Sequence, residues 1–301
     1  MTLLKDFLRE GTAALEHLYS AGEARSVVMT LCEDLLGTKS YTHIVDPGYA
    51  IEGPKEALMQ ESLRRLVAGE PVQYVSGKAS FCGRTFRVDP SVLIPRPETE
   101  QLCREAEKIG RVFQRLRMPY GHNAKPVRVL DLCCGSGCIT WTMSLSVPGA
   151  RVVGVDISEA AIAVAVGQDF SKEVKEVSAI APSFVRADVL DSGADLGGEE
   201  FDLILSNPPY VLESEKAGMR KNVLDFEPAL ALFVPDGDPL VFHRAIAEHS
   251  KRIISREGVG ITEVNEGFAV EVQALMRDAG FKETEILKDI FGKNRFVLYK
   301  K

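Results

Sequence analysis

The chain has 301 residues, of which 45% are hydrophobic and 26% charged, and its formal net charge is -7. This length favours two domains, the composition is that of a globular protein, and the acidic balance argues against a broad basic face for a nucleic-acid backbone. No apolar run reaches the roughly 20 residues of a membrane span. The first residues carry Asp6, Arg9 and Glu10, where a signal peptide needs an apolar core, so we expect a cytoplasmic protein.

Residues 1–75 are predicted to form a small helical domain. Apolar residues recur at helical spacing in segments 3–19, 24–37 and 55–69. Gly37 and Gly69 are typical helix ends. The apolar faces of these helices are expected to form the core of this domain.

Residues 76–97 alternate in polarity and contain several Gly and Pro residues, a pattern typical of an irregular β-hairpin. We predict that this hairpin links two domains. A helix is expected over 96–118, with Thr99 available as its N-terminal cap and acidic residues in its first turn.

Residues 98–301 are predicted to form a doubly wound, mostly parallel α/β domain. Two helices are expected, at 158–170 and 239–254, and the last residues, 284–301, read as two extended runs joined by the GKN turn, a hairpin signal. Short apolar runs of the kind buried in a parallel sheet lie at 127–132, 151–157, 183–189, 201–207 and 258–264.

The chain has six cysteines, and none of them belongs to a CxxC pair. The CCGSGC run at 133–138 contains adjacent thiols, which suit tetrahedral metal coordination poorly. We expect reduced cysteines and no metal site.

Ligands of open α/β sheets bind beyond the carboxyl ends of the strands. The first predicted strand of this domain runs into the small-residue turn at 133–137, and the next strands end at Asp156, Asp188 and Asn207. Asp156 lies about two dozen residues after Asp131, where an acid accepts hydrogen bonds from ribose hydroxyls. For Asp156 and Asp188, the alternative is that they are plain turn residues.

Asp131 distinguishes between two classes of cofactor. A pyrophosphate would gain nothing from a carboxylate two residues before the turn, whereas the sulfonium and ammonium groups of S-adenosylmethionine would be attracted to it. The charge argument therefore favours S-adenosylmethionine over a nicotinamide dinucleotide. The alternative is that Asp131 bonds backbone groups of the turn.

Five segments together resemble the release-factor glutamine methyltransferases: LIPRPETE, LDLCCGSGC, GVDIS, SNPPYV and FEPALAL. The resemblance runs from about residue 70 to the end. It implies a seven-stranded, Rossmann-like methyltransferase domain that uses S-adenosylmethionine to methylate N5 of the glutamine in the Gly-Gly-Gln motif of peptide chain release factors. It also implies that residues 1–75 help to dock the release factor, and we expect a monomer. The cofactor-binding residues are then predicted to be Asp131, Cys133, Cys134, Gly135, Ser136, Gly137, Asp156, Asp188, Val189 and Asn207.

The SNPPYV segment suits methylation of an amide. An amide nitrogen is a poor nucleophile, and acceptors on both of its N–H groups would hold it in line and localise its lone pair. The Asn207 side-chain oxygen and the Pro208 carbonyl are the predicted acceptors, Pro209 restricts the backbone of Pro208, and the Tyr210 ring is predicted to stack on the amide. The alternatives are a surface turn and a tyrosine that only packs.

Three further features bear on this hypothesis. Cys133 stands where the family usually has Gly, and at a positive φ it would cost conformational energy. Arg96 and Glu98 either line the cofactor pocket or form a pair that fixes the joint between domains. The polar stretch 212–228 is predicted to be a mobile loop over a protein substrate, with Phe226, Glu227 and Pro228 shaping the entrance.

Two other functions remain open at the level of sequence. The NPPY segment also occurs in methyltransferases of exocyclic amines in nucleic acids, which need a flipped base and a surface that holds the strand. An inactive cofactor-binding scaffold with an altered Cys133 turn is the other alternative.

Overall fold

The computed structural model describes residues 2–117, 125–198 and 200–301. The chain divides into two compact units. Unit 1 consists of Met1–Ala79, Val88–Pro90 and Met219–Glu227, and unit 2 consists of Ser80–Arg87, Ser91–Gly218 and Pro228–Lys301. The domain boundaries at residues 75 and 97 that we drew from the sequence stay predictions.

Unit 1 is built from helices around one apolar core. The core contains Leu4, Phe7, Val28, Leu31 and Met59, all almost fully buried. The expectation of an all-helical region needs one correction, because a two-stranded antiparallel pair closes this core. The elements are β1 (Thr2–Leu3), α1 (Leu4–Leu15), α2 (Ala21–Leu36), α3 (Thr42–Val45), β2 (Ala50–Ile51), α4 (Pro54–Val67), α5 (Val72–Ser76) and α10 (Lys221–Phe226).

Local chemistry accounts for the ends of helix α2. The Ser20 hydroxyl accepts a hydrogen bond from the Glu23 N–H and so caps the first turn. Gly37 closes the helix in the left-handed conformation, with φ at 73°, which a residue without Cβ adopts at little cost.

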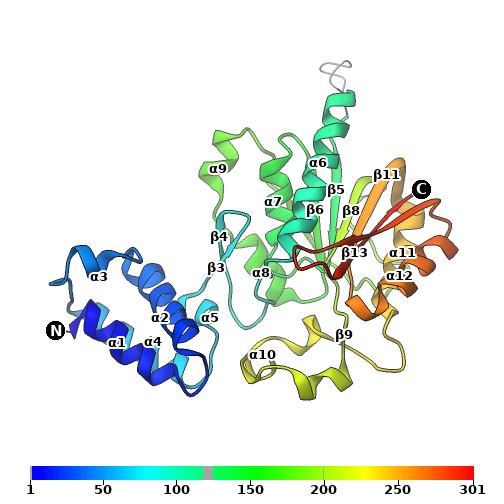
Figure 1. Cartoon of the computed structure of the whole chain (residues 1–301). Coiled ribbons are helices and arrows are strands. Elements are labelled where there is room, and N and C mark those ends of the chain that lie inside the picture. The colour runs from blue at the N-terminus through cyan, green and yellow to red at the C-terminus, as the bar shows by residue number, and fades with distance from the viewer. Residues whose placement is uncertain (1, 118–124, 199) are drawn as a thin grey trace. The chain divides into compact units, whose positions relative to one another are not determined.

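Unit 2 contains a seven-stranded sheet in the order β12-β13-β11-β8-β5-β6-β7 (Figure 1). β13 runs antiparallel to both of its neighbours, and the other adjacent pairs are parallel. This confirms the mostly parallel, doubly wound sheet and the antiparallel C-terminal hairpin. The strands are β5 (Arg128–Leu132), β6 (Arg151–Asp156), β7 (Ser183–Arg186), β8 (Phe201–Ser206), β11 (Ile254–Glu263), β12 (Glu283–Lys288) and β13 (Asn294–Lys300).

Each face of the sheet carries its own core, because successive side chains of a strand point to opposite faces. Val129 packs into the core under helices α6 (Thr99–Arg117) and α7 (Cys138–Ser146). Its neighbour Leu130 packs into the core under helices α11 (Val241–Ile253) and α12 (Ala269–Asp278). Figure 1 shows these helix pairs on the two sides of the sheet.

The predicted helices differ from the observed ones at their ends: the helix expected from residue 96 begins as α6 at Thr99, and the helix expected over 239–254 is α11 (Val241–Ile253). Residue 118, placed in the helix that became α6, lies outside the described residues. The helix predicted over 158–170 ends as α8 (Glu159–Val166), and α9 (Ser171–Glu176) follows. The break has a physical reason, since the Gln168 side chain bonds both the N–H and the carbonyl of Arg87 at 2.9 Å.

The remaining elements are short. The stretch 212–228, expected as a mobile loop, carries two short helical segments. Within the described ranges, none of the helices combines the length and apolar character that crossing a membrane requires. The short elements are β3 (Lys78–Phe81), β4 (Arg84–Arg87), β9 (Val211–Leu212), η2 (Glu213–Gly218), η3 (Ala229–Ala231), β10 (Phe233–Val234) and η4 (Glu266–Phe268).

Candidate active site

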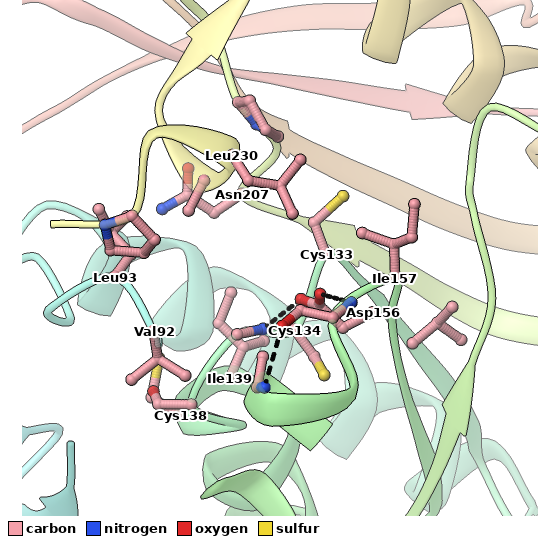
Figure 2. A pocket seen from close by; sticks show the side chains of 18 of the residues that line it. Val92, Leu93, Cys133, Cys134, Cys138, Ile139, Asp156, Ile157, Asn207 and Leu230 are labelled. Atoms are coloured by element: carbon pink, nitrogen blue, oxygen red, sulfur yellow. Dashed lines mark hydrogen bonds between the residues drawn. The ribbon is translucent and has the colours of Figure 1, made fainter. Parts of the chain in front are cut away.

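A cavity of about 270 Å³ lies in unit 2 beyond the carboxyl ends of β5, β6 and β8. Figure 2 shows side chains from the turn after β5, from the end of β6 and from the residue after β8 around this cavity. The structure thus brings together most of the site residues that the sequence predicted. Those in the wall are Cys133, Cys134, Gly135, Ser136, Asp156, Asp188, Val189, Asn207 and Pro209.

The turn after β5 depends on left-handed backbone conformations. Gly135 and Gly137 have φ of 52° and 76°, and Cys133 has φ of 62° although it carries a Cβ. The condition under which Cys133 costs conformational energy is therefore met. The Cys134 N–H donates to the Val155 carbonyl at 2.9 Å, which fastens the turn to the neighbouring strand.

Asp156 joins the turn to the end of β6. Its carboxylate accepts hydrogen bonds from the N–H groups of Gly135 and Ser158, each at 2.9 Å. Burial raises the pKa of Asp156, and these backbone N–H groups act against that rise. Asp188 accepts a hydrogen bond from the Leu190 N–H at 2.9 Å, which is the turn role that the sequence left as an alternative. Both carboxylates nevertheless lie in the cavity wall.

Asp131 does not line the cavity but is fully buried behind it. The Thr140 hydroxyl donates to its Oδ2 at 2.5 Å, and its Oδ1 has no hydrogen-bond partner among the described residues. Burial raises the pKa of Asp131 to about 7. The sequence predicted Asp131 as a cofactor-binding residue, and the structure places it outside the cavity wall.

The loop after β8 carries Asn207, Pro208, Pro209 and Tyr210. Asn207 and Pro209 line the cavity, while Pro208 and Tyr210 do not. Among the described residues, neither Asn207 Oδ1 nor the Pro208 carbonyl receives a hydrogen bond. The two predicted acceptors therefore have free lone pairs.

A buried carboxylate, Glu263, connects this loop to helix α6. Thr99 Oγ1 donates to Glu263 Oε2 at 2.8 Å, and Asn207 Nδ2 donates to Thr99 Oγ1 at 3.1 Å. The Tyr210 hydroxyl donates to Glu263 Oε1 at 2.8 Å. The expected role of Thr99 as the cap of this helix is corrected, since α6 begins at Thr99 itself and the Thr99 hydroxyl bonds Glu263 and Asn207.

Burial raises the pKa of both partners of this pair. Burial raises the pKa of Tyr210 well above its usual value, so its hydroxyl keeps its proton. Burial also raises the pKa of Glu263, whereas the hydroxyls of Thr99 and Tyr210 and the charge of Arg295 favour its ionised form. His243 Nε2 donates to the Glu263 backbone carbonyl at 3.0 Å and holds the end of β11.

Several residues in the cavity wall, and Glu263 outside it, were missed by the sequence reading. Glu263 and Thr99 are separated by 164 positions, and no local pattern pairs them. The one available signal was an acid inside the apolar run 258–264, because carboxylates are rarely buried without partners. Other missed wall residues are Ser91, Val92, Leu93, Cys138, Ile139, Ile157, Ser158, Leu230 and Phe242.

The structure also places the residues that were predicted at the rim of the site. Arg96 lies in the cavity wall, and Glu98 does not. Pro228 also lines the cavity, while Phe226 and Glu227 belong to unit 1. Within the described ranges, no three His, Cys, Asp or Glu side chains are grouped as a metal ion requires.

The wall fits S-adenosylmethionine. Val92, Ile139, Ile157, Leu230 and Phe242 offer apolar surface for a flat base. The charged wall residues are Asp156, Asp188 and Arg96, so carboxylates outnumber cations. Together with Asp131 Oδ1, which lacks a hydrogen-bond partner among the described residues, this excess of carboxylates suits a ligand that carries positive charge and no phosphate.

Comparison with known proteins identifies the family. A model described as "Methyltransferase small domain" matches residues 117–249, and one described as "PrmC N-terminal domain" matches residues 6–77. The T. thermophilus 16S rRNA N2 G1207 methyltransferase, solved with AdoMet and guanosine, aligns with a TM-score of only 0.44 and 19% identity over 74% of this chain and 49% of that chain. The assignment therefore rests on sequence relatives.

Those relatives cover nearly the whole chain. The release factor glutamine methyltransferase of Bacteroides thetaiotaomicron is 37% identical over 284 residues, which are 94% of this chain and 95% of that protein. The release factor glutamine methyltransferase of Flavobacterium psychrophilum is 33% identical over 295 residues, or 98% of each chain. The chain belongs to the release factor glutamine methyltransferase family.

Proposed function

We propose that this chain transfers the methyl group of S-adenosylmethionine to the side-chain nitrogen of the glutamine in the Gly-Gly-Gln motif of peptide chain release factors. The observation that carries the proposal is Asn207, which lies in the cavity wall with its Oδ1 free and its Nδ2 bonded to Thr99. The names of the relatives support the substrate class.

Catalysis rests on positioning and electrostatics. S-adenosylmethionine supplies an electrophilic methyl group on a sulfonium. Asn207 Oδ1 and the Pro208 carbonyl accept the two N–H groups of the substrate amide, which orients its nitrogen and localises the lone pair. Pro209 limits the backbone freedom of Pro208, so the carbonyl stays aimed. The methylated nitrogen is strongly acidic, so no strong base is required.

We place the reaction in the cytoplasm, in keeping with a substrate that acts in translation, and we propose that the enzyme works as a monomer. We also propose that the helical unit 1 contributes to docking the release factor. Its exposed apolar side chains Tyr41, Ile44 and Val45 offer surface for a protein partner.

The test is transfer of labelled methyl from S-adenosylmethionine to three acceptors: an intact release factor, a release factor whose Gly-Gly-Gln glutamine is replaced by Ala, and duplex DNA. Label on the intact factor alone supports the proposal. Label on DNA would favour a nucleic-acid amine methyltransferase, and cofactor binding without transfer to any acceptor would favour a non-catalytic scaffold. Either of these results overturns the proposal.

A further inference from the structure

Glu263 lies outside the cavity wall, but its two carboxylate oxygens accept hydrogen bonds from the hydroxyls of Thr99 and Tyr210. Both hydroxyl groups help to hold the loop 207–210 after β8, which we call the catalytic loop. Its exposed fraction is 1%. Burying a carboxylate is costly unless hydrogen bonds compensate for the lost water, and a neutral or apolar side chain would avoid this cost. A carboxylate at position 263, bonded to Thr99 and Tyr210, therefore points to a functional role.

We infer that Glu263 is a positioning residue whose carboxylate sets the direction of the hydrogen bonds that make Asn207 present its oxygen, and not its nitrogen, to the substrate amide. The inference rests on the proposed function, because it concerns how the site selects an amide that donates two N–H groups.

The direction follows from counting protons. A threonine hydroxyl has one proton to donate, and Thr99 donates it to Glu263 Oε2 at 2.8 Å. Thr99 Oγ1 can then only accept from Asn207, which it does at 3.1 Å from Nδ2. The remaining polar atom of the Asn207 amide is Oδ1, and it is left for the substrate.

The opposite orientation of Asn207 would disable the site. Its NH2 group would then face the N–H groups of the substrate amide, so that donor would meet donor. A carboxylate at position 263 prevents this, because it only accepts hydrogen bonds and so forces each hydroxyl around it to donate.

The second carboxylate oxygen of Glu263, Oε1, holds the end of the catalytic loop at Tyr210. The Tyr210 hydroxyl donates to Oε1 at 2.8 Å, so Glu263 is tied to both residues that flank Pro208 and Pro209. The loop is thus fixed both in place and in hydrogen-bond polarity.

The substitution Glu263→Gln keeps the shape of the side chain and removes this constraint. A glutamine amide donates as well as accepts, so its NH2 group can bond Thr99 Oγ1 and release the hydroxyl proton toward Asn207 Oδ1. We expect kcat on an intact release factor to fall about 10- to 100-fold, the size typical of losing an outer partner of a reactive group, with KM for S-adenosylmethionine changed less than about threefold.

Thr99 provides the matched set of variants. Thr99→Val removes the hydroxyl, and we expect a loss of kcat similar to that of Glu263→Gln; Thr99→Ser keeps a hydroxyl and should recover most of that loss. The control is Thr142→Val in α7, since Thr142 is 3% exposed and its hydroxyl has no partner in the described part of the chain. Its turnover should equal that of the wild type.

A binding measurement separates this inference from the proposed function. By calorimetry without turnover, the wild type should prefer a Gly-Gly-Gln peptide to a Gly-Gly-Glu peptide, whose carboxylate has no N–H to offer, and Glu263→Gln should reduce that preference. An unchanged kcat and an unchanged preference in Glu263→Gln would overturn the inference. The inference would also be overturned if the kcat of Thr99→Ser were no higher than that of Thr99→Val, because Thr99 would then serve packing alone. Failure of wild-type methyl transfer with the peptide preference intact would instead count against the proposed function alone.

Discussion

Cys133 occupies a backbone conformation that glycine adopts more easily. Its φ is 62°, and its side chain packs against the core under α11 and α12. Burial raises the pKa of the Cys133 thiol well above its usual value, so the group stays neutral beside the cofactor site. At Cys133, the packing of the side chain therefore offsets part of the cost of the strained backbone.

Substitutions at this turn can separate strain from packing. Cys133→Ala and Cys133→Gly both remove the sulfur, but only Ala keeps a Cβ at positive φ. We expect Cys133→Gly to be about 1 kcal/mol more stable than Cys133→Ala in chemical unfolding. At the buried neighbour Cys134, which has an ordinary φ, the same pair should show the reverse order. The same order at both positions would contradict this account of strain.

Asp131 predicts a pH dependence of stability. Its pKa is raised to about 7 by burial, above the ordinary 3.8 of an unfolded chain, so the folded state binds the proton more tightly. The resulting stabilisation is complete below about pH 4 and is lost as the pH rises through about 7. Between about pH 5 and pH 8, the wild type should lose roughly 3 kcal/mol more of its free energy of unfolding than Asp131→Asn. Parallel pH profiles for the two proteins would contradict the buried-carboxylate assignment.

At the scale of elements, strand β11 both carries a residue of the catalytic network and packs closely against β13. Its end carries Glu263, and its middle approaches the C-terminal strand so closely that only glycine fits. A Cβ at Gly260 would lie 2.0 Å from Tyr299 Cζ, and Tyr299 is fully buried with its hydroxyl bonded to Ser250 at 2.8 Å. The ring therefore has no free space into which to move.

Gly260→Ala should consequently destabilise the protein by about 3 kcal/mol, the upper part of the range for overpacked cores. The measurement is the free energy of unfolding in urea. Gly237→Ala is the matched control, because a Cβ there meets no atom within 4 Å and its φ is not positive. Equal stability of the two variants would show that β11 and β13 can separate at low cost.

The elements also show how far sequence patterns reach. Buried strands were predictable because short apolar runs mark them, and the place of Asp156 and Asn207 in one cavity wall was predictable because the carboxyl ends of parallel strands share one edge. Helix α9 was not, since its sequence SKEVKE has no apolar period. The bond from Thr99 to Glu263 was beyond reach, because it depends on how α6 packs against β11 and not on either segment alone.

At the scale of the whole molecule, the chain combines a helical unit with a methyltransferase unit that contains the entire cavity wall. Every residue that we assign to the chemistry belongs to the second unit. This division separates the recognition of a protein substrate, proposed for unit 1, from the transfer itself. It also means that a substitution on the surface of unit 1 should change release-factor binding without changing cofactor affinity.

Asn207→Ala tests the central claim most directly, by single-turnover methyl transfer to an intact release factor together with the Kd for S-adenosylmethionine. Removing one of the two acceptors that hold the substrate amide should slow transfer about 100-fold or more, while the Kd changes less than about threefold. Transfer at the wild-type rate would contradict the role of the SNPPYV loop, and so would a loss of transfer that follows entirely from a loss of cofactor binding.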